Sequence, residues 1–188
     1  DAGYEVVTDP PEVDERELDH LFAEDPRAQA VELARRKATA VAGRHPDSVV
    51  LGGDQVGVLD LPTGPRQLTK QPDEEGAVAQ LLAMSGTTHR LVNGLVVLRT
   101  GPAGEVTAAV DGVDVQTVTM RDFDERAARA YVRRFEPFDS AGSYRLEDQE
   151  HLTGEERFVV RVDGEDPSGV LGMPLPLLRR LLDRLAEA

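Results

Sequence analysis

The sequence predicts an α/β protein in which helices and strands follow one another along 188 residues. Three observations predict this class. The unbroken apolar run at 49–51 is typical of a strand buried on both faces. A helix with a stripe of small apolar residues begins just after Asp25. Two long strand-rich segments follow at 88–100 and 105–120, and the chain has the length of one domain, residues 1–188.

The composition excludes several classes of function. Apolar residues make up 40% of the chain and charged residues 30%, as in ordinary globular proteins. No apolar run approaches the roughly 20 residues that span a bilayer, so we expect no membrane role. The net charge of −14, without a basic stripe, repels a phosphate backbone, so nucleic acid is a poor partner. A small phosphate ester can still bind where a divalent cation and a few Lys or Arg residues mediate.

The chain has no cysteine. This excludes disulfides, thiolate metal sites and a cysteine nucleophile, and it fits a reducing cytoplasm. The sequence opens at Asp1 without an initiator methionine and shows no signal peptide, so we expect native residues to precede it.

The first part of the chain predicts one well-defined helix. Residues 1–3 resemble the end of a helix and 4–7 a short strand, followed by an acidic loop at 9–25 with a helical turn near 17–22. A helix then begins with Asp25 as N-cap and Pro26 in its first position. Lys37 lies at the edge of its apolar stripe, where a lysine ordinarily extends its ammonium to water. The stripe comprises Ala30, Val31, Ala34, Ala38 and Val41.

The stretch Ser48 to Leu59 is the most informative one. Its buried strand is predicted to end in Gly52-Gly53-Asp54 before the apolar pattern resumes. Two glycines allow a close approach to the backbone, and the carboxylate that follows could hold a metal ion or a reacting water. The alternative is a turn aspartate that bonds its own backbone.

The remaining elements follow in order. Residues 61–67 predict a turn, and a helix from about Asp73 to Ser85 ends at Gly86. Residues 101–104 predict the hairpin turn between the two long strand-rich segments. Asp122 or Asp124 caps a third helix, 138–148 is a polar and aromatic loop suited to binding, 157–162 is a strand, and 174–187 is a final helix.

Six fragments in order resemble the Maf family of nucleoside triphosphate pyrophosphatases over nearly the whole chain. They are Val13-Asp14-Glu15, Leu33-Ala34-Arg35-Arg36-Lys37-Ala38, Leu51-Gly52-Gly53-Asp54-Gln55-Val56, Leu82-Ala83-Met84-Ser85-Gly86, Glu136-Pro137-Phe138-Asp139-Ser140-Ala141-Gly142-Ser143-Tyr144, and Gly172-Met173-Pro174-Leu175. The resemblance implies a mixed α/β fold, a bent sheet flanked by helices with a central cleft between two lobes. It also implies a cytoplasmic enzyme that hydrolyses a nucleoside triphosphate to the monophosphate and pyrophosphate, and often a homodimer.

The chain departs from the family pattern in three places. The family's phosphate-binding Ser-x-Ser-Pro-Arg-Arg element is not present in this chain, which starts after it. The family's Gly-Lys-Pro appears as Thr69-Lys70-Gln71-Pro72, which makes the role of Lys70 less secure. Met173 replaces the leucine of Gly-Leu-Pro-Leu, a conservative change.

The resemblance assigns the catalytic residues. Asp54 matches the family's catalytic acid and could take a proton from the attacking water. Glu15 matches a second acid, and the two could hold Mg²⁺ or Mn²⁺ through oxygen ligands, although a solvated loop charge is the ordinary alternative for Glu15. Lys37 and Lys70 match family lysines that could bind phosphate oxygens.

The loop at 138–148 is expected to face the base. Ser143-Tyr144-Arg145-Leu146-Glu147 resembles the 7-methyl-GTP branch of the family, which implies substrate-binding roles for Tyr144, Arg145 and Glu147. Gln55, right after the acid, also resembles this branch, and it either points into the same cleft to bind substrate or packs beneath it. A carboxylate at Glu147 can accept hydrogen bonds from the N1–H and the amino group of guanine. Tyr144 or Phe138 could stack on a positively charged methylated base, the alternative for Tyr144 being core packing.

These observations leave three functions open. The first is a pyrophosphatase with a 7-methyl-GTP-like preference, and the second a UTP, CTP or dTTP pyrophosphatase of the same family. The third is a nucleotide-binding regulator of cell division without turnover, since the family is linked by name to septum inhibition. Pyrophosphate release over a nucleotide panel with Mg²⁺ separates them.

Overall fold

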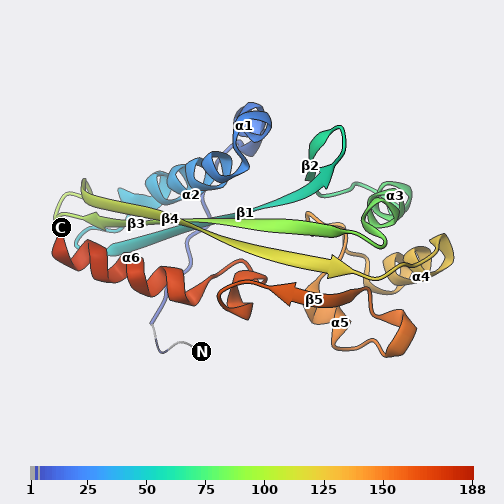
Figure 1. Ribbon diagram of the computed structural model, residues 1–188. Coiled ribbons are helices and arrows are strands. Elements are labelled where there is room, and N and C mark those ends of the chain that lie inside the picture. Colours follow the sequence, from blue (N-terminus) through green and yellow to red (C-terminus); the bar gives the residue numbers. More distant parts are fainter. Residues whose placement is uncertain (1–2, 4) are drawn as a thin grey trace. The chain divides into compact units, whose positions relative to one another are not determined.

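The computed structural model describes residue 3 and residues 5–188, and it has the α/β class that the sequence predicts (Figure 1). The chain divides into two compact units. Unit 1 comprises Asp1–Gln55, Val92–Asp114 and Glu165–Ala188, and unit 2 comprises Val56–Leu91 and Val115–Gly164. The single domain and the cleft expected from the resemblance stay predictions.

Five strands form one sheet in the order β2-β1-β3-β4-β5. The pairs β1–β2 and β4–β5 are antiparallel. The amide of Thr100, at the end of β3, donates to the carbonyl of Ser48, just before β1, at 3.0 Å, so these neighbours also run in opposite directions. The strands are β1 (Val49–Leu61), β2 (Gly64–Leu68), β3 (Thr88–Thr100), β4 (Val106–Met120) and β5 (Val159–Asp163).

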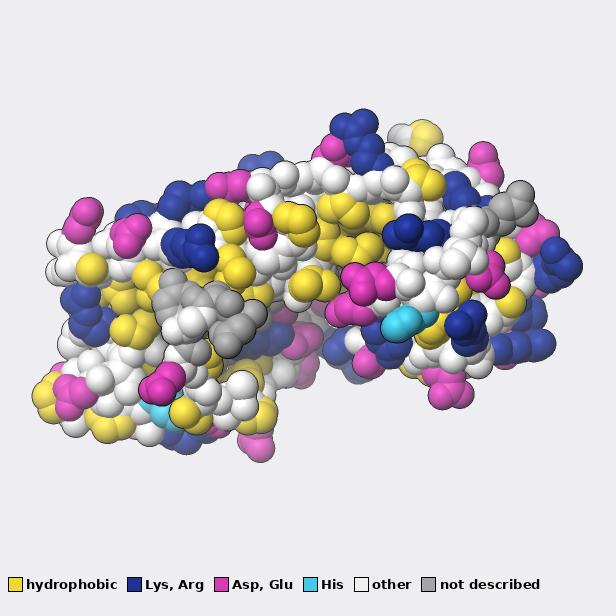
Figure 2. Space-filling view, turned by 90° about the horizontal axis from the view of Figure 1, so that it is seen from below, with side chains coloured by type: hydrophobic (Ala, Val, Ile, Leu, Met, Phe, Trp, Pro, Cys, Tyr) yellow, Lys and Arg dark blue, Asp and Glu magenta, His cyan; other side chains and the backbone are white. Residues whose placement is uncertain are grey.

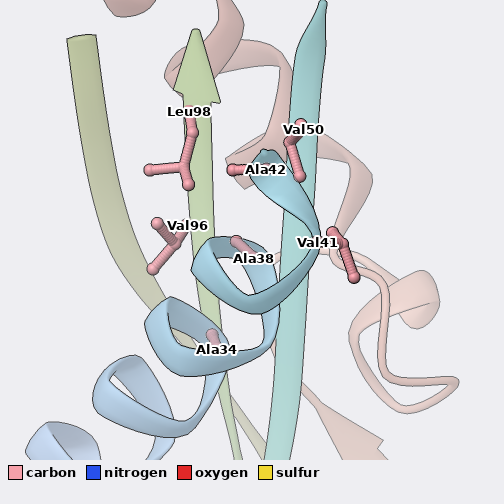
Figure 3. Packing of buried hydrophobic residues seen from close by; sticks show 7 residues of the cluster. All are labelled: Ala34, Ala38, Val41, Ala42, Val50, Val96 and Leu98. Atoms are coloured by element: carbon pink, nitrogen blue, oxygen red, sulfur yellow. The ribbon is translucent and has the colours of Figure 1, made fainter. Parts of the chain in front are cut away.

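Unit 1 places a helix on each face of its strands (Figure 1). Alternate residues of a strand point to opposite faces. On one face, α2 packs its alanines against β1 and β3, as Figure 3 shows, and on the other α6 packs its leucines against Leu95 and Val97. The helices of this unit are η1 (Glu15–Leu18), α1 (Asp19–Glu24), α2 (Pro26–Ala42), η3 (Pro167–Gly169) and α6 (Leu175–Glu187).

Helix α2 lies on the strands at backbone contact distance. A Cβ atom added to Gly52 of β1 would come within 2.2 Å of the carbonyl oxygen of Ala34, and one added to Gly94 of β3 within 2.3 Å of the carbonyl carbon of Ala30. Only glycine allows so close an approach at these two positions. The two glycines and the alanines that face them therefore set the height of α2 above the sheet.

Unit 2 has its own core of aromatic side chains. The rings of Phe123 and Phe158 stack with centroids 4.1 Å apart, and the ring of Tyr131 lies 5.2 Å from Phe158. Helices α3 and α4 pack together, and Arg129 of α4 pairs with Glu74 at 2.8 Å. The helices of this unit are α3 (Glu74–Met84), α4 (Glu125–Phe135), α5 (Leu146–Gln149) and η2 (Gly154–Glu156).

Several predicted elements are confirmed and others are wrong. Asp25 caps α2 by accepting from the amide of Arg27 at 2.8 Å, and the turn at 101–104 joins β3 to β4. The predicted turn at 61–67 is wrong in its second half, because β2 begins at Gly64 and pairs with β1. Of the helix end and strand predicted at 1–7, residues 1, 2 and 4 lie outside the described residues, and 5–7 have no regular structure.

None of the helices in the described ranges combines the length and the apolar character that a membrane-spanning segment needs.

Candidate functional site

Unit 1 brings together three of the four residues predicted to be catalytic. The ammonium of Lys37, on α2, donates to Oδ1 of Asp54 on β1 at 2.6 Å. The same nitrogen lies 2.7 Å from Oε1 of Glu15, the first residue of η1. A helix, a strand and a turn that are distant in sequence thus converge on one cation.

The strand positions Asp54 on the face that α2 covers. Val50 and Gly52 share this face, because they stand two and four residues before Asp54. The prediction that the strand ends at Asp54 is wrong, since β1 continues to Leu61. An aspartate within a strand also does not fit the alternative of a turn residue that bonds its own backbone.

Local contacts hold Glu15 near the pair. The side chain of Asp14 accepts from the amide of Arg16 at 3.1 Å and so begins the short helix η1. Arg36 of α2 donates to Glu17 at 2.7 Å, which ties η1 to the helix that carries Lys37. Glu15 nevertheless remains half-exposed, with 53% of its side chain accessible against 10% for Asp54.

The two carboxylates keep Lys37 charged. Burial by itself lowers the pKa of Lys37, but the hydrogen bonds to Asp54 and Glu15 outweigh burial, so this pKa is raised above the ordinary value of 10.5. The alternative that Lys37 simply extends to water does not describe the structure, because its ammonium bonds two acids.

The same carboxylates suit a divalent cation that arrives with a triphosphate. Among the described residues, no group of three or more His, Cys, Asp or Glu side chains is placed to hold a metal by itself. Mg²⁺ is usually bound by one or two carboxylates together with substrate phosphates and water. Glu15 and Asp54 already direct oxygens at one common point, the ammonium of Lys37, and this donor set fits such a shared ion.

Gln55 lies on the opposite face of β1 from Asp54. Its amide donates to Oδ1 of Asn93 at 2.9 Å and to the carbonyl of Gly169 at 3.2 Å. Asn93 in turn donates to Asp114 at 3.1 Å and to Gly169 at 2.8 Å. The structure thus favours the alternative that Gln55 packs beneath the site, within a buried polar network, over a role in facing substrate.

The remaining predicted residues belong to unit 2. Lys70 is exposed, in the segment between β2 and α3. Arg145 pairs with Asp139 and donates to the carbonyl of Phe135 at 3.1 Å, so its guanidinium is already engaged by the fold. Glu147 is exposed in the first turn of α5.

Tyr144 is buried in the core of unit 2. Only 5% of it is exposed, its hydroxyl bonds Nε2 of the fully buried His89 at 2.8 Å, and the two rings meet edge to face. Burial raises the pKa of the Tyr144 hydroxyl. These contacts favour the alternative of core packing over base stacking. Phe138, the second stacking candidate, is partly exposed.

Two polar residues at the site were missed by sequence reasoning. They are Asn93, which anchors Gln55, and Gln80 of α3, whose amide joins two loops of unit 2. Neither stands in a recognisable motif, and most of their partners are 11 or more residues away in sequence. Since only the fold brings these partners together, spacing along the chain carries no signal of them.

A pocket of about 820 Å³ lies elsewhere in unit 2, beside α4. Its walls include Phe123, Arg126, Arg134 and Phe158, and none of the predicted site residues lines it. On one face of the molecule, Figure 2 shows acidic and basic side chains interspersed.

Comparison with known proteins gives a consistent result. The family described as Maf-like protein matches residues 1–185. A 7-methyl-GTP pyrophosphatase of Cupriavidus pinatubonensis is 37% identical over 163 residues, which cover 86% of this chain and 75% of the relative. A dTTP/UTP pyrophosphatase of Deinococcus radiodurans is 37% identical over 158 residues, covering 84% and 73%. A nucleoside triphosphate pyrophosphatase of Corynebacterium diphtheriae is 34% identical over 184 residues, covering 96% and 84%.

Proposed function

Because this chain belongs to the Maf family, we propose that it hydrolyses a nucleoside triphosphate to the monophosphate and pyrophosphate. The observation that carries this proposal is the cluster of Glu15, Lys37 and Asp54. The carboxylates of Glu15 and Asp54 lie 2.7 and 2.6 Å from the ammonium of Lys37. The relatives' names, all of them pyrophosphatases acting on nucleotides, support the same reaction class.

The reaction needs a base, and Asp54 is the residue that supplies it. A water oxygen attacks the α-phosphorus, the bond from that phosphorus to the bridging oxygen breaks, and pyrophosphate leaves with the electron pair. Asp54 accepts the proton that the water loses. Its side chain is only 10% exposed, so few bulk waters compete for the carboxylate.

Lys37 supplies positive charge for the phosphates. It is protonated throughout the physiological range because its pKa is raised. When a triphosphate enters, the ammonium can exchange a carboxylate partner for a phosphate oxygen without losing its charge. Glu15 and Asp54 would then hold Mg²⁺ or Mn²⁺, and when bound this ion supplies neutralisation of the phosphate charge. Lys70 is also proposed to contact a phosphate oxygen.

The substitution Asp54→Asn tests this assignment. The amide keeps the shape of the side chain but cannot accept the proton, so we expect kcat to fall by roughly 10²–10⁴ with Mg²⁺ present. Pyrophosphate release over a panel of nucleotides is the measurement, and circular dichroism checks that the variant is folded.

Asp60→Asn is the matched control, because Asp60 lies on the same strand but is exposed and paired with Arg90 at 2.7 Å. It should retain wild-type activity. A folded Asp54→Asn protein that keeps more than a tenth of the wild-type kcat would remove Asp54 as the base. A wild type that hydrolyses no nucleotide in the panel would favour the alternative of a nucleotide-binding regulator.

We further propose that the preferred base is 7-methylguanine. Glu147 supports this preference, since an exposed carboxylate next to the 138–145 loop can accept from the two donors that guanine presents. A UTP, CTP or dTTP preference is the alternative, and a relative of each kind is similar to the chain. The cytoplasmic location and the homodimer remain predictions, checked by cell fractionation and by light scattering.

A further inference from the structure

The side-chain amide of Gln80 joins two loops of unit 2. Its Oε1 accepts from the amide of Thr69 at 3.1 Å, and its Nε2 donates to the carbonyl of Thr69 at 2.9 Å. The same Nε2 donates to the hydroxyl of Ser143 at 2.7 Å and to the carbonyl of Ala141 at 3.2 Å. One glutamine on α3 therefore binds the residue before Lys70 and the loop that leads to Glu147.

A second glutamine, Gln71, connects the segment Thr69–Gln71, called the Lys70 segment below, to Gln80. Nε2 of Gln71 donates to the carbonyl of Thr69 at 3.2 Å, to its hydroxyl at 3.0 Å, and to Oε1 of Gln80 at 3.3 Å. Both neighbours of Lys70 are thus hydrogen-bonded to α3 or to each other. These bonds hold the backbone of Thr69 and the side chain of Gln71, so Lys70 stands between two anchored residues.

On the other side of the bridge, Ser143 is held in a strained conformation. Its φ of 56° lies in the left-handed region that a serine rarely adopts, and it is fully buried. Such a conformation persists only where surrounding contacts enforce it. The bond from Gln80 to its hydroxyl and the bond from its own amide to the carbonyl of Ser140 at 3.1 Å are such contacts.

The two loops that Gln80 joins are also electrostatically close. The hydrogen bond from Arg145 holds the pKa of Asp139 below its ordinary value, and the charge of Lys70 adds to that lowering. Lys70 therefore lies near Asp139 of the 138–148 segment. The bridge and the charges together place the lysine segment beside the segment that carries Glu147.

We propose that Gln80 is a positioning residue, which fixes the Lys70 segment relative to the 138–148 loop and so controls nucleotide affinity and base selection. This proposal rests on the proposed function, in that Lys70 contacts phosphate and Glu147 the base. Glu15, Lys37 and Asp54 belong to unit 1 and Gln80 to unit 2, and the role proposed for Gln80 concerns binding and not the proton transfer.

The test is Gln80→Met, which keeps the volume but removes all the amide hydrogen bonds. We expect KM for 7-methyl-GTP to rise at least tenfold and the ratio of kcat/KM for 7-methyl-GTP over UTP to fall at least threefold. We expect kcat at saturation to change less than threefold. Gln67→Met is the matched control, since the Gln67 side chain makes no hydrogen bond in the part of the chain that the structure describes, and it should change neither value.

Two further measurements make each outcome decisive. Dissociation constants for the α,β-methylene analogues of 7-methyl-GTP and UTP test the positioning role even if the protein hydrolyses neither nucleotide, so failure of the proposed function is seen separately. Ser143→Ala removes only the hydroxyl that Gln80 binds. If Gln80→Met does not fold, the affinities and the base ratio of Ser143→Ala test the proposal instead. Unchanged affinities and base ratio in the folded variant overturn the proposal. So does a fall in kcat with the base ratio intact, which indicates a purely structural role.

Discussion

Two charged residues of the segment 138–148, a loop that continues into α5, are used differently by the fold. Arg145 bonds Asp139 and the carbonyl of Phe135, and its amide donates to the hydroxyl of Tyr131 at 3.0 Å. Glu147 is exposed, and its carboxylate makes no hydrogen bond or ion pair in the part of the chain described here. Arg145 therefore shapes the loop, and Glu147 is the residue available to a base.

Glu147→Gln is expected to weaken the preference for 7-methyl-GTP. A carboxylate only accepts, so it suits the two donors of guanine, whereas uracil and thymine present a donor flanked by carbonyl oxygens. We expect the ratio of kcat/KM for 7-methyl-GTP over UTP to shrink about tenfold, which is about 1.4 kcal/mol. Glu150→Gln, an exposed acid just after α5, is the control. Equal rates on both nucleotides in the wild type would remove the base assignment and leave the reaction class intact.

At the scale of residues, the sequence predicted which charged residues come together better than it predicted where uncharged side chains point. The pairing of Lys37 with Asp54 and Glu15 agrees with their motif positions, because the resemblance aligns all three. Whether Tyr144 stacks on a base or packs in the core depends on His89, which stands 55 residues earlier, and the sequence left both open. The sequence also left open whether Gln55 points into the cleft or packs beneath it, because the face of β1 on which a residue lies depends on how the strand is placed in the sheet.

At the scale of elements, the site depends on how closely α2 packs on the strands β1 and β3. A Cβ on Gly52 would overlap the backbone carbonyl of Ala34, and also lie 2.8 Å from the Cβ of Ala38. Neither atom belongs to a flexible side chain, so the helix itself has to move to relieve the overlap. Lys37 is on that helix and Asp54 is two residues from that glycine.

We therefore expect Gly52→Ala to destabilise the protein by about 3 kcal/mol through overpacking. It should also lower kcat, because the displaced helix moves Lys37 from Asp54. Urea denaturation and pyrophosphate release measure the two effects. Gly43→Ala is the control, since a Cβ there meets nothing within 4 Å and φ is −64°, and it should be neutral or stabilising. A Gly52→Ala protein as stable and active as wild type would show that α2 is not seated in this way.

Elements were predictable where their signals are local. Asp25, Asp73 and Asp124 each cap a helix by accepting from an amide two or three residues ahead, and these caps can be read from the sequence. Strand β2 was not predicted, because Gly64 and Pro65 are turn residues by propensity and only pairing with β1 makes them a strand. The continuation of β1 through Gly52 has the same kind of cause, since the close approach of α2 requires a glycine at that position.

For the molecule as a whole, one buried histidine contributes to the acid sensitivity. His89 is fully buried on β3, and its Nδ1 has no hydrogen-bond partner within the described residues. Burial lowers the pKa of His89 from 6.5 to about 4. The folded state thus holds this ring neutral at pH values where the unfolded chain protonates it.

Because protonation of His89 favours the unfolded chain, its contribution to the free energy of unfolding is fully present above pH 6.5 and is lost as the pH falls from 6.5 to about 4. Between pH 7 and pH 4.5 the loss is roughly 2 kcal/mol. In His89→Gln this part of the pH dependence should disappear, even if the variant is less stable at pH 7. Urea denaturation at the two pH values measures it. His151→Gln, at an exposed histidine, should behave as wild type, and an equal pH dependence in His89→Gln would contradict the assignment.

The contact of α2 with β1 and β3 also determines which of the residues around it can be substituted during evolution. The larger side chains that surround it, such as Val50 and Leu98, can exchange for other apolar residues of similar volume at modest cost. Gly52 and Gly94 have no such freedom, because a Cβ at either position would meet backbone atoms of α2, and at Gly52 also the Cβ of Ala38. The larger apolar residues of this core can therefore change while α2 still presents Lys37 to Asp54, provided that the two glycines stay.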